Sequence, residues 1–256
     1  MKNYQFLLIV MCLIPSFLLA DEVDNGLPSD TSSIVKESAR MAINAGIDNQ
    51  GVIKMTRLMV ENKYKEQQML EVHQILMNAN QQNLPESPII NRFYECISKK
   101  EKAENSIMAL ETVRSRYETA SEYAGMITRD RVETRMMTEL IVQCMTAGMG
   151  DIDLKQITEL LEKRTKNMKT EEARALNNGT LNTVRTMARS GADSGSVTDL
   201  VSNAFQMDYT AKDMEKLGIA FLKQCKDKSS ASALAESYAN SIIGGATADN
   251  IANPEY

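Results

Sequence analysis

The chain has 256 residues, with 29 Lys and Arg against 34 Asp and Glu, and its formal net charge is −5. This balance repels phosphate backbones and anionic lipid surfaces, which argues against nucleic-acid binding. With a single histidine and no CxxC pair among four cysteines, the sequence offers no local zinc site, and we expect no metal and no cofactor.

Residues 1–20 have the order of a secretory signal peptide. Lys2 supplies a positive charge, an apolar run over residues 6–14 follows, and Pro15 precedes Ala20 at the expected cleavage site. Because this run is far shorter than the ~20 residues that span a bilayer, we expect cleavage rather than a permanent anchor. An uncleaved leader attached to the envelope is the alternative. We therefore expect a periplasmic or secreted protein with no integral membrane segment after cleavage.

Residues 21–33 are acidic, small and turn-forming, and we expect a flexible leader there. From 34 to 245 the apolar spacing is helical and no strand is expected, so this part should form one all-α domain. Residues 246–256 should be a C-terminal tail. The expected helices span 34–45, 50–62, 66–80, 88–99, 103–127, 131–146, 152–163, 171–189, 196–206, 211–225 and 231–243.

Stop and start signals agree with these ranges. Glycines able to take the left-handed conformation follow three apolar runs, at Gly46, Gly148 and Gly191. Side-chain oxygens that can cap a first turn stand at Asp130, Thr170 and Thr210. About eleven helices, joined by short breaks, predict stacked helical hairpins in an irregular α-solenoid-like or orthogonal multi-helix array.

Two parts of the chain also resemble each other. A shift of 145 residues lays Gly46 on Gly191 and Tyr64 on Tyr209, with apolar helical positions matched on either side. This match predicts helical repeats. The stop glycines are unequally spaced along the chain, so no array with a fixed period is expected.

Few residues point to catalysis or metal binding. The only histidine, His73, lies among apolar residues of an expected helix, so we expect a structural role. Carboxylates such as Glu133 and Glu139 carry no recognisable catalytic pattern, and we expect no catalytic residue. Methionine pairs four residues apart, such as Met55 and Met59, favour core filling over Cu(I) binding.

Three cysteines remain after the expected processing: Cys96, Cys144 and Cys225. Helical spacing to apolar neighbours favours three buried thiols. One disulfide with one free thiol is the alternative, because the environment outside the cytoplasm is oxidising.

The segment "NLPESPIINRFYECISK", residues 83–99, concentrates unusual residues. Pro85 should end the preceding helix, and Ser87 with Pro88 should cap and begin the next one. Three charged residues then follow at helical spacing, at Arg92, Glu95 and Lys99. They form either surface ion pairs or a site whose two cations hold an anionic ligand.

This segment resembles a recurring element of uncharacterised exported bacterial all-helical proteins, written LPxxPxxx(K/R)xxExxxK. The matching residues are Leu84, Pro85, Pro88, Arg92, Glu95 and Lys99. Asn83 stands in place of a turn glycine and Cys96 in place of the glycine after the glutamate. The resemblance implies export and an all-α fold. It implies no activity, since none is established for these proteins.

The sequence therefore favours an exported, non-enzymatic helical protein that acts as an interaction or structural module of the cell envelope. Its partner would be an unidentified protein or a second copy of the chain. The alternative is a ligand-binding protein or an enzyme with a site between hairpins, near Arg92, Glu95 and Lys99.

Overall fold

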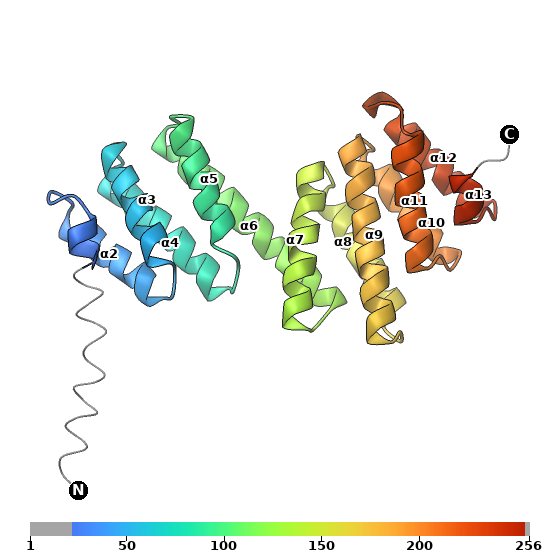
Figure 1. Cartoon of the computed structure of the whole chain (residues 1–256), viewed down its shortest axis with the longest axis horizontal. Coiled ribbons are helices and arrows are strands. Elements are labelled where there is room, and N and C mark those ends of the chain that lie inside the picture. Colours follow the sequence, from blue (N-terminus) through green and yellow to red (C-terminus); the bar gives the residue numbers. More distant parts are fainter. Residues whose placement is uncertain (1–21, 254–256) are drawn as a thin grey trace, which may run out of the picture. The chain divides into compact units, whose positions relative to one another are not determined.

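The computed structural model describes residues 22–253, and this part is all-α, with no strand (Figure 1). All eleven expected helices are confirmed, with ends within two residues of the expected ones. The helices are α2 (Ser33–Asn44), α3 (Asn49–Glu61), α4 (Glu66–Gln81), α5 (Ser87–Ser98), α6 (Ala103–Ile127), α7 (Arg131–Ala147), α8 (Asp151–Thr165), α9 (Thr170–Ser190), α10 (Ser194–Gln206), α11 (Ala211–Gln224), the short 3-10 helix η1 (Lys228–Ser230), α12 (Ala231–Ile243) and α13 (Ala248–Ala252).

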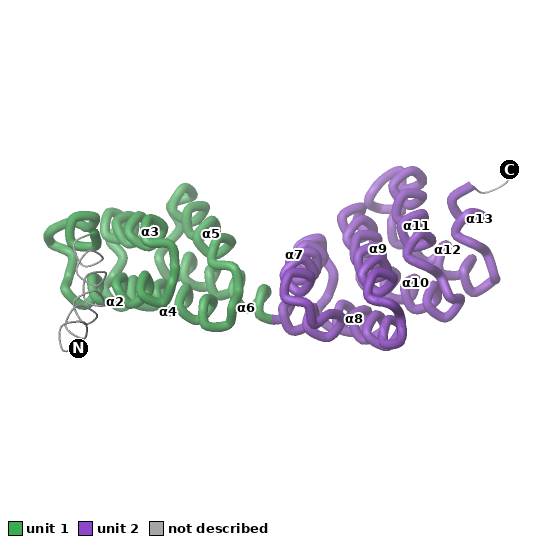
Figure 2. Tube along the Cα trace, turned by 60° about the horizontal axis from the view of Figure 1, so that its bottom comes forward, with its two compact units in different colours: residues 1–118 green, residues 119–256 purple. Residues whose placement is uncertain are grey.

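The chain divides into two compact units, residues 1–118 and 119–256 (Figure 2). The division falls within the long helix α6, whereas the sequence favours a single helical domain over 34–245. Sequence periodicity carries no sign of it, because α6 continues through the division as an uninterrupted helix.

In the first unit, a helix packs both on the next helix of the chain, as α2 does on α3, and on the helix two further along. Helix α4 packs on α2, and α5 packs on α3, so successive hairpins stack in two layers. Methionine and phenylalanine fill the core between them: Met55, Met59 and Phe93 are fully buried. The methionines thus serve as core residues, as expected.

The second unit follows the same rule. Helices α7, α9, α11 and α13 form one layer, and α8, α10 and α12 form the other. Helices α9 and α11 approach closely at two glycines. A Cβ on Gly179 would lie 3.0 Å from the Ala211 carbonyl oxygen, and a Cβ on Gly218 would lie 3.0 Å from Thr183 Oγ1. The Thr183 hydroxyl uses this proximity to donate to the Met214 carbonyl at 2.7 Å.

Left-handed turns close eight of the described helices. In each turn a residue with positive φ follows the helix, and the next N–H returns to the carbonyl five residues back, as in a Schellman motif. Tyr64 N–H, for example, donates to the Met59 carbonyl at 3.0 Å. The left-handed residues are Gly46, Lys63, Asn83, Lys100, Gly148, Gly191, Asp208 and Gly245. The residue after them is apolar and buried at Ile47, Tyr64, Leu84, Met149, Ala192 and Tyr209.

Several of these turns are 37 residues apart, a spacing that is not seen when only the glycines are compared. Asn83 lies 37 residues after Gly46, and Gly245 lies 37 residues after Asp208. Half of the turn residues are not glycine, so a comparison of stop glycines cannot find this spacing. The turns at Lys63 and Asp208 also put the aligned Tyr64 and Tyr209 in equivalent buried positions. A common origin of these hairpins stays a prediction.

The expected flexible leader, residues 21–33, and the expected C-terminal tail, residues 246–256, each contain a short helix within the described residues. Residues 22–26 are helical, and Val23 and Leu27 are buried, so this part of the expected leader packs on the first unit. Arg57 of α3 anchors it by donating to the Gly26 carbonyl at 2.7 Å. In the expected tail, α13 packs on α11 through buried Ile251. The expected signal peptide, residues 1–20, lies outside the described residues.

Two expected N-caps, Ser87 and Thr170, are instead the first residues of their helices. Helix α5 begins at Ser87 with Glu86 as its N-cap, and α9 begins at Thr170 with Lys169 as its N-cap. The expected capping at Asp130 and Thr210 is confirmed, since each side chain accepts a backbone N–H of the first turn.

Among residues 22–253, none of the helices combines the length and the apolar composition that crossing a bilayer requires.

Replacing glycine by alanine should change the free energy of unfolding in opposite directions at two positions of the second unit. Gly148 has a φ of 114° and nothing within 4 Å of a built Cβ, whereas Gly125 lies in helix α6 with the same open space and no positive φ. Gly148→Ala should lower the free energy of unfolding by about 1 kcal/mol, because only the backbone conformation opposes it. Gly125→Ala should raise it by about 0.5 kcal/mol. Urea unfolding measures both, and a loss of stability in each variant would contradict the assignment of the turn.

Candidate functional site

The charged triplet predicted from the sequence lies on the exposed face of α5. Arg92 Nη1 lies 2.8 Å from Glu95 Oε2, and Arg92 Nη2 lies 3.9 Å from Glu101 Oε1. Lys99 and Glu95 are exposed. The hydrogen bond that Arg92 donates to Glu95 is the main cause that raises the pKa of Arg92. This is the geometry of a surface ion pair, and none of the three residues lines a cavity described below.

All three described cysteines are free thiols. Cys96 and Cys144 are buried, and Cys225 is half-buried. Burial raises the pKa of Cys144 to about 12, so this thiol stays protonated and is a poor nucleophile. The expectation of unpaired thiols is thus confirmed, whereas Cys225 is less buried than the sequence pattern indicates.

His73 connects three helices of the first unit. It is fully buried, with Nε2 2.8 Å from Thr56 Oγ1 of α3 and Nδ1 3.0 Å from Ser38 Oγ of α2. The Thr56 hydroxyl donates its proton to the Val52 carbonyl, so it accepts from His73 Nε2–H, and Ser38 donates to Nδ1. Burial lowers the pKa of His73 to about 4. With both ring nitrogens occupied, this histidine is structural.

A groove between α2 and α4 is the most apolar of the described cavities. It has a volume of about 650 Å³ and is lined by residues of these two helices. Ile34 and Met41 of α2 are 56% and 54% exposed, and they lie two helical turns apart on its wall. We call this cavity the α2–α4 groove.

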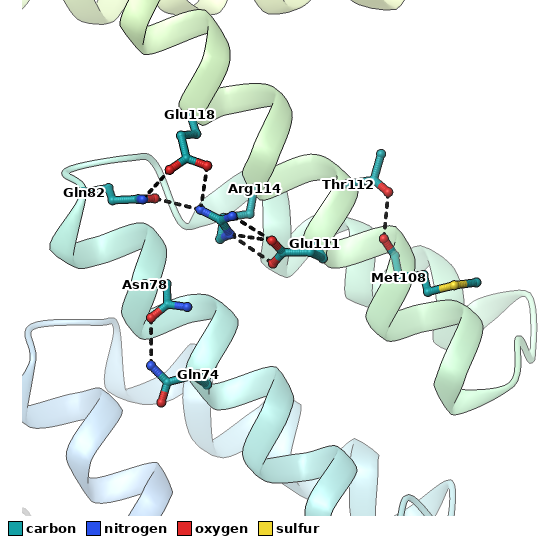
Figure 3. Close-up of polar contacts among 8 residues, drawn as sticks. All are labelled: Gln74, Asn78, Gln82, Met108, Glu111, Thr112, Arg114 and Glu118. Atoms are coloured by element: carbon teal, nitrogen blue, oxygen red, sulfur yellow. Dashed lines mark hydrogen bonds and ion pairs between the residues drawn. The ribbon is translucent and has the colours of Figure 1, made fainter.

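Amide side chains continue from the groove along α4. Gln74 lines the groove, and Asn78 and Gln82 follow at intervals of one turn (Figure 3). Gln74 Nε2 donates to Asn78 Oδ1 at 2.7 Å. This bond uses Gln74 Nε2 and Asn78 Oδ1, so Gln74 Oε1 remains an acceptor and Asn78 Nδ2 remains a donor.

Arg114 of α6 closes the far end of this amide row. Its Nη1 donates to Gln82 Oε1 at 2.8 Å, and its guanidinium contacts Glu111 and Glu118 on either side (Figure 3). These carboxylates raise the pKa of Arg114, with the Glu111 hydrogen bond as the largest cause. Gln82 also donates to Glu118. Gln82 is therefore occupied, and only Gln74 and Asn78 offer unused amide groups.

Two further cavities lie in the second unit. One, of about 470 Å³ between α10 and α12, is lined by polar residues that include Asp199 and Glu236. The other, of about 720 Å³, lies where α6 ends and α7 begins, beside the end of α8 and the start of α9. Glu133 and Asn177 are buried residues in its lining. Within residues 22–253, no three His, Cys, Asp or Glu side chains gather as a metal site would require.

The sequence by itself singles out neither the amide row of α4 nor the buried Glu133 as part of a site. Gln74 and Asn78 look like ordinary polar residues of an exposed helix face, and Glu133 is one carboxylate among many. The i to i+4 spacing of amides on α4 is the one available signal.

Comparison with known proteins adds no relative: no family model, no curated protein and no solved structure matches this chain.

The depressed pKa of His73 predicts a loss of stability in acid. The native state keeps the ring neutral, whereas the unfolded chain takes up a proton below a pH of about 6.5. The free energy of unfolding should therefore fall as the pH drops from about 6.5 to about 4, by about 3 kcal/mol in total. Above that range His73 should have no effect, because it is neutral in both states.

Proton NMR can follow this titration directly, since His73 is the only histidine in the chain. Urea unfolding of His73→Gln against pH provides the comparison, because its carboxylates titrate as in the parent while residue 73 does not. Equal pH slopes of the two proteins, or a His73 midpoint near 6.5, would contradict the prediction.

Proposed function

We propose that this chain is an exported, non-enzymatic binding protein and that its α2–α4 groove holds an extended segment of a partner protein. The observation that carries the proposal is the combination of exposed apolar side chains in the groove, Ile34 and Met41, with amide groups beside them. Gln74 in the lining keeps an acceptor, and Asn78, one turn beyond the lining, keeps a donor. A peptide presents the same two kinds of groups: apolar side chains and a regular row of backbone N–H and C=O.

The spacing of the amides suits an extended chain. Gln74 and Asn78 are four residues apart, which corresponds to about 6 Å along a helix axis. Two residues of an extended chain cover about 6.8 Å, and the N–H and C=O of one residue point to the same edge. A bound peptide can thus donate an N–H to Gln74 Oε1 and accept from Asn78 Nδ2.

The apolar wall supplies the remaining affinity. Ile34 and Met41 present more than half of their surface to solvent, and Leu70 and Met77 of α4 line the opposite wall. Burying one such side chain contributes about 1.5–3 kcal/mol, which is more than a hydrogen bond of about 1 kcal/mol. Apolar residues of the peptide therefore determine its affinity, and the amides determine its direction and register.

Two other possibilities rank lower. Self-association through the groove would use the same apolar residues, and the test below separates it from peptide binding. An enzyme or anion-binding site at Arg92, Glu95 and Lys99 lacks support from the geometry, since Arg92 is engaged by Glu95 on an exposed helix face.

Selection of short random peptides on the immobilised full-length chain tests the groove. Selected peptides should carry apolar residues at alternate positions, and fluorescence anisotropy should give saturable binding. The double variant Ile34→Lys and Met41→Lys should weaken binding at least about tenfold, because it removes apolar burial. Asn78→Ala should weaken it about threefold to tenfold through one lost hydrogen bond.

The matched control is Ile219→Lys with Leu222→Lys on α11 of the second unit, since Ile219 is 55% exposed. It should leave the affinity unchanged. Selected peptides that bind the groove variant as tightly as the parent would refute the peptide site. Concentration-dependent dimers of the parent that the groove variant abolishes would assign the groove to self-association instead.

Export is the second part of the proposal. Cleavage after Ala20 would leave intact the packed residues 22–27, whose Asp24 pairs with Arg40 at 2.7 Å. Expression of the full chain in a Gram-negative host should yield a periplasmic product that begins at Asp21, as read by intact mass. A product that keeps residues 1–20 and stays in the cytoplasmic fraction would contradict export.

A further inference from the structure

The cavity of about 720 Å³ in the second unit has a floor made of hydrogen-bond acceptors. We call it the α7–α9 cavity, and its floor consists of Glu133 of α7, Thr165 of α8 and Asn177 of α9, all buried. It shares no residue with the α2–α4 groove. Its volume falls within the ~300–1,000 Å³ typical of small-molecule sites.

Glu133 is a buried carboxylate with few partners. The residue is 6% exposed, and its one ion pair is to Arg174 Nε at 3.5 Å, longer than an ordinary hydrogen bond. Glu133 is the third residue of α7, from which a capping-box side chain would accept the N–H of the N-cap Asp130. That N–H instead donates to Thr128 Oγ1 at 3.3 Å, so the Glu133 carboxylate is not used in this way. A buried charge of this kind is stable when further donors reach it.

Asn177 adds a second acceptor without a donor. The residue is 1% exposed, and its Nδ2 donates to the Ile127 carbonyl at 3.2 Å, which fixes the orientation of the amide. Its Oδ1 is buried and has no hydrogen-bond partner. Leaving such an atom unpaired costs about 1–3 kcal/mol, so a ligand that donates to it recovers this energy.

Thr165 provides the third acceptor. Its hydroxyl donates to the Leu161 carbonyl at 2.8 Å, so its lone pairs are what it can offer to the cavity. The floor thus presents an acceptor on each of the three side chains, and its one remaining side-chain donor is the second Nδ2–H of Asn177. A primary ammonium group is the complement of such a floor, since it carries one positive charge and three N–H donors.

Positively charged side chains surround the entrance, or rim, of the cavity, whereas the floor presents acceptors. Arg129, Lys163 and Lys166 are exposed cations there, beside Glu162 and Asp130. Asp130 already accepts the Glu133 backbone N–H at 2.9 Å. The cations repel a diamine or polyamine at the entrance but attract a carboxylate.

We propose that the α7–α9 cavity binds a small zwitterion of the amino-acid class. Its ammonium donates to Glu133, Asn177 and Thr165 on the floor, and its carboxylate lies toward Arg129, Lys163 and Lys166 at the rim. The proposal is independent of peptide binding in the first unit, so either can fail without the other.

Isothermal titration of the full chain with each free L-amino acid tests this. At least one should bind with a dissociation constant of about 1 mM or below. The N-acetylated form of that amino acid should not bind, because it lacks the ammonium. The matching amine without a carboxylate should bind more weakly. Absence of binding by every free amino acid, or equal binding of the N-acetylated form, would overturn the proposal and leave a cavity filled by water only.

Variants then assign the site. Glu133→Gln should weaken binding at least about tenfold, since it removes the charge that meets the ammonium. The matched control, Glu172→Gln, changes an exposed glutamate of α9 outside the cavity and should keep the parent affinity. Equal affinity of Glu133→Gln and the parent would refute the assignment.

A second readout guards against a folding defect in the Glu133 variant. In the unaltered chain, the side-chain amide of Asn177 should shift in proton–nitrogen NMR spectra as the amino acid is added. An Asn177 resonance that stays in place while binding heat is observed would locate the ligand elsewhere and overturn the proposal.

Discussion

At the end of α3 the chain turns through Lys63 in the left-handed region, and the Tyr64 N–H returns to the carbonyl of Met59. The turn satisfies a carbonyl that the helix leaves open and delivers the Tyr64 ring into the core. The same turn closes eight of the described helices. Because it both ends a helix and buries the following apolar residue, it fixes where the next helix starts and which face it presents to its neighbours.

Packing within each unit follows from these turns. A hairpin has an apolar face that it cannot bury alone, so helices two apart in the chain lie side by side in two layers. Where α9 meets α11, Gly179 and Gly218 allow a closer approach than larger residues would. Such a stack leaves grooves between neighbouring helices, and the proposed peptide site and zwitterion site are two of these grooves with different linings.

The buried polar groups separate structural from binding positions. His73 has both ring nitrogens in hydrogen bonds to the protein, so its polar atoms are used within the fold. Asn177 is satisfied on one side only, and Glu133 has one long ion pair. Both groups can accept a further hydrogen bond, and this capacity is what the proposed zwitterion site uses. Exposed Gln74 and half-buried Asn78 are a similar case nearer the surface, since their mutual bond occupies only one group of each amide.

The sequence alone determined the class and order of the helices and the capping at Asp130 and Thr210, because periodicity and turn chemistry act over a few residues. It favoured unpaired cysteines but left one disulfide open, and only the structure shows the described thiols free. It placed Arg92 and Glu95 within reach of each other on one helix turn, and the structure decided between a surface ion pair and a binding site. The turns at Lys63 and Asp208 are equally local, but no glycine marks them in the sequence. Tertiary structure alone decided the burial of Val23 and the division within α6. It also decided which polar residues share a groove. Those features depend on contacts between residues far apart in the chain, and no local pattern encodes which helix face meets which neighbour.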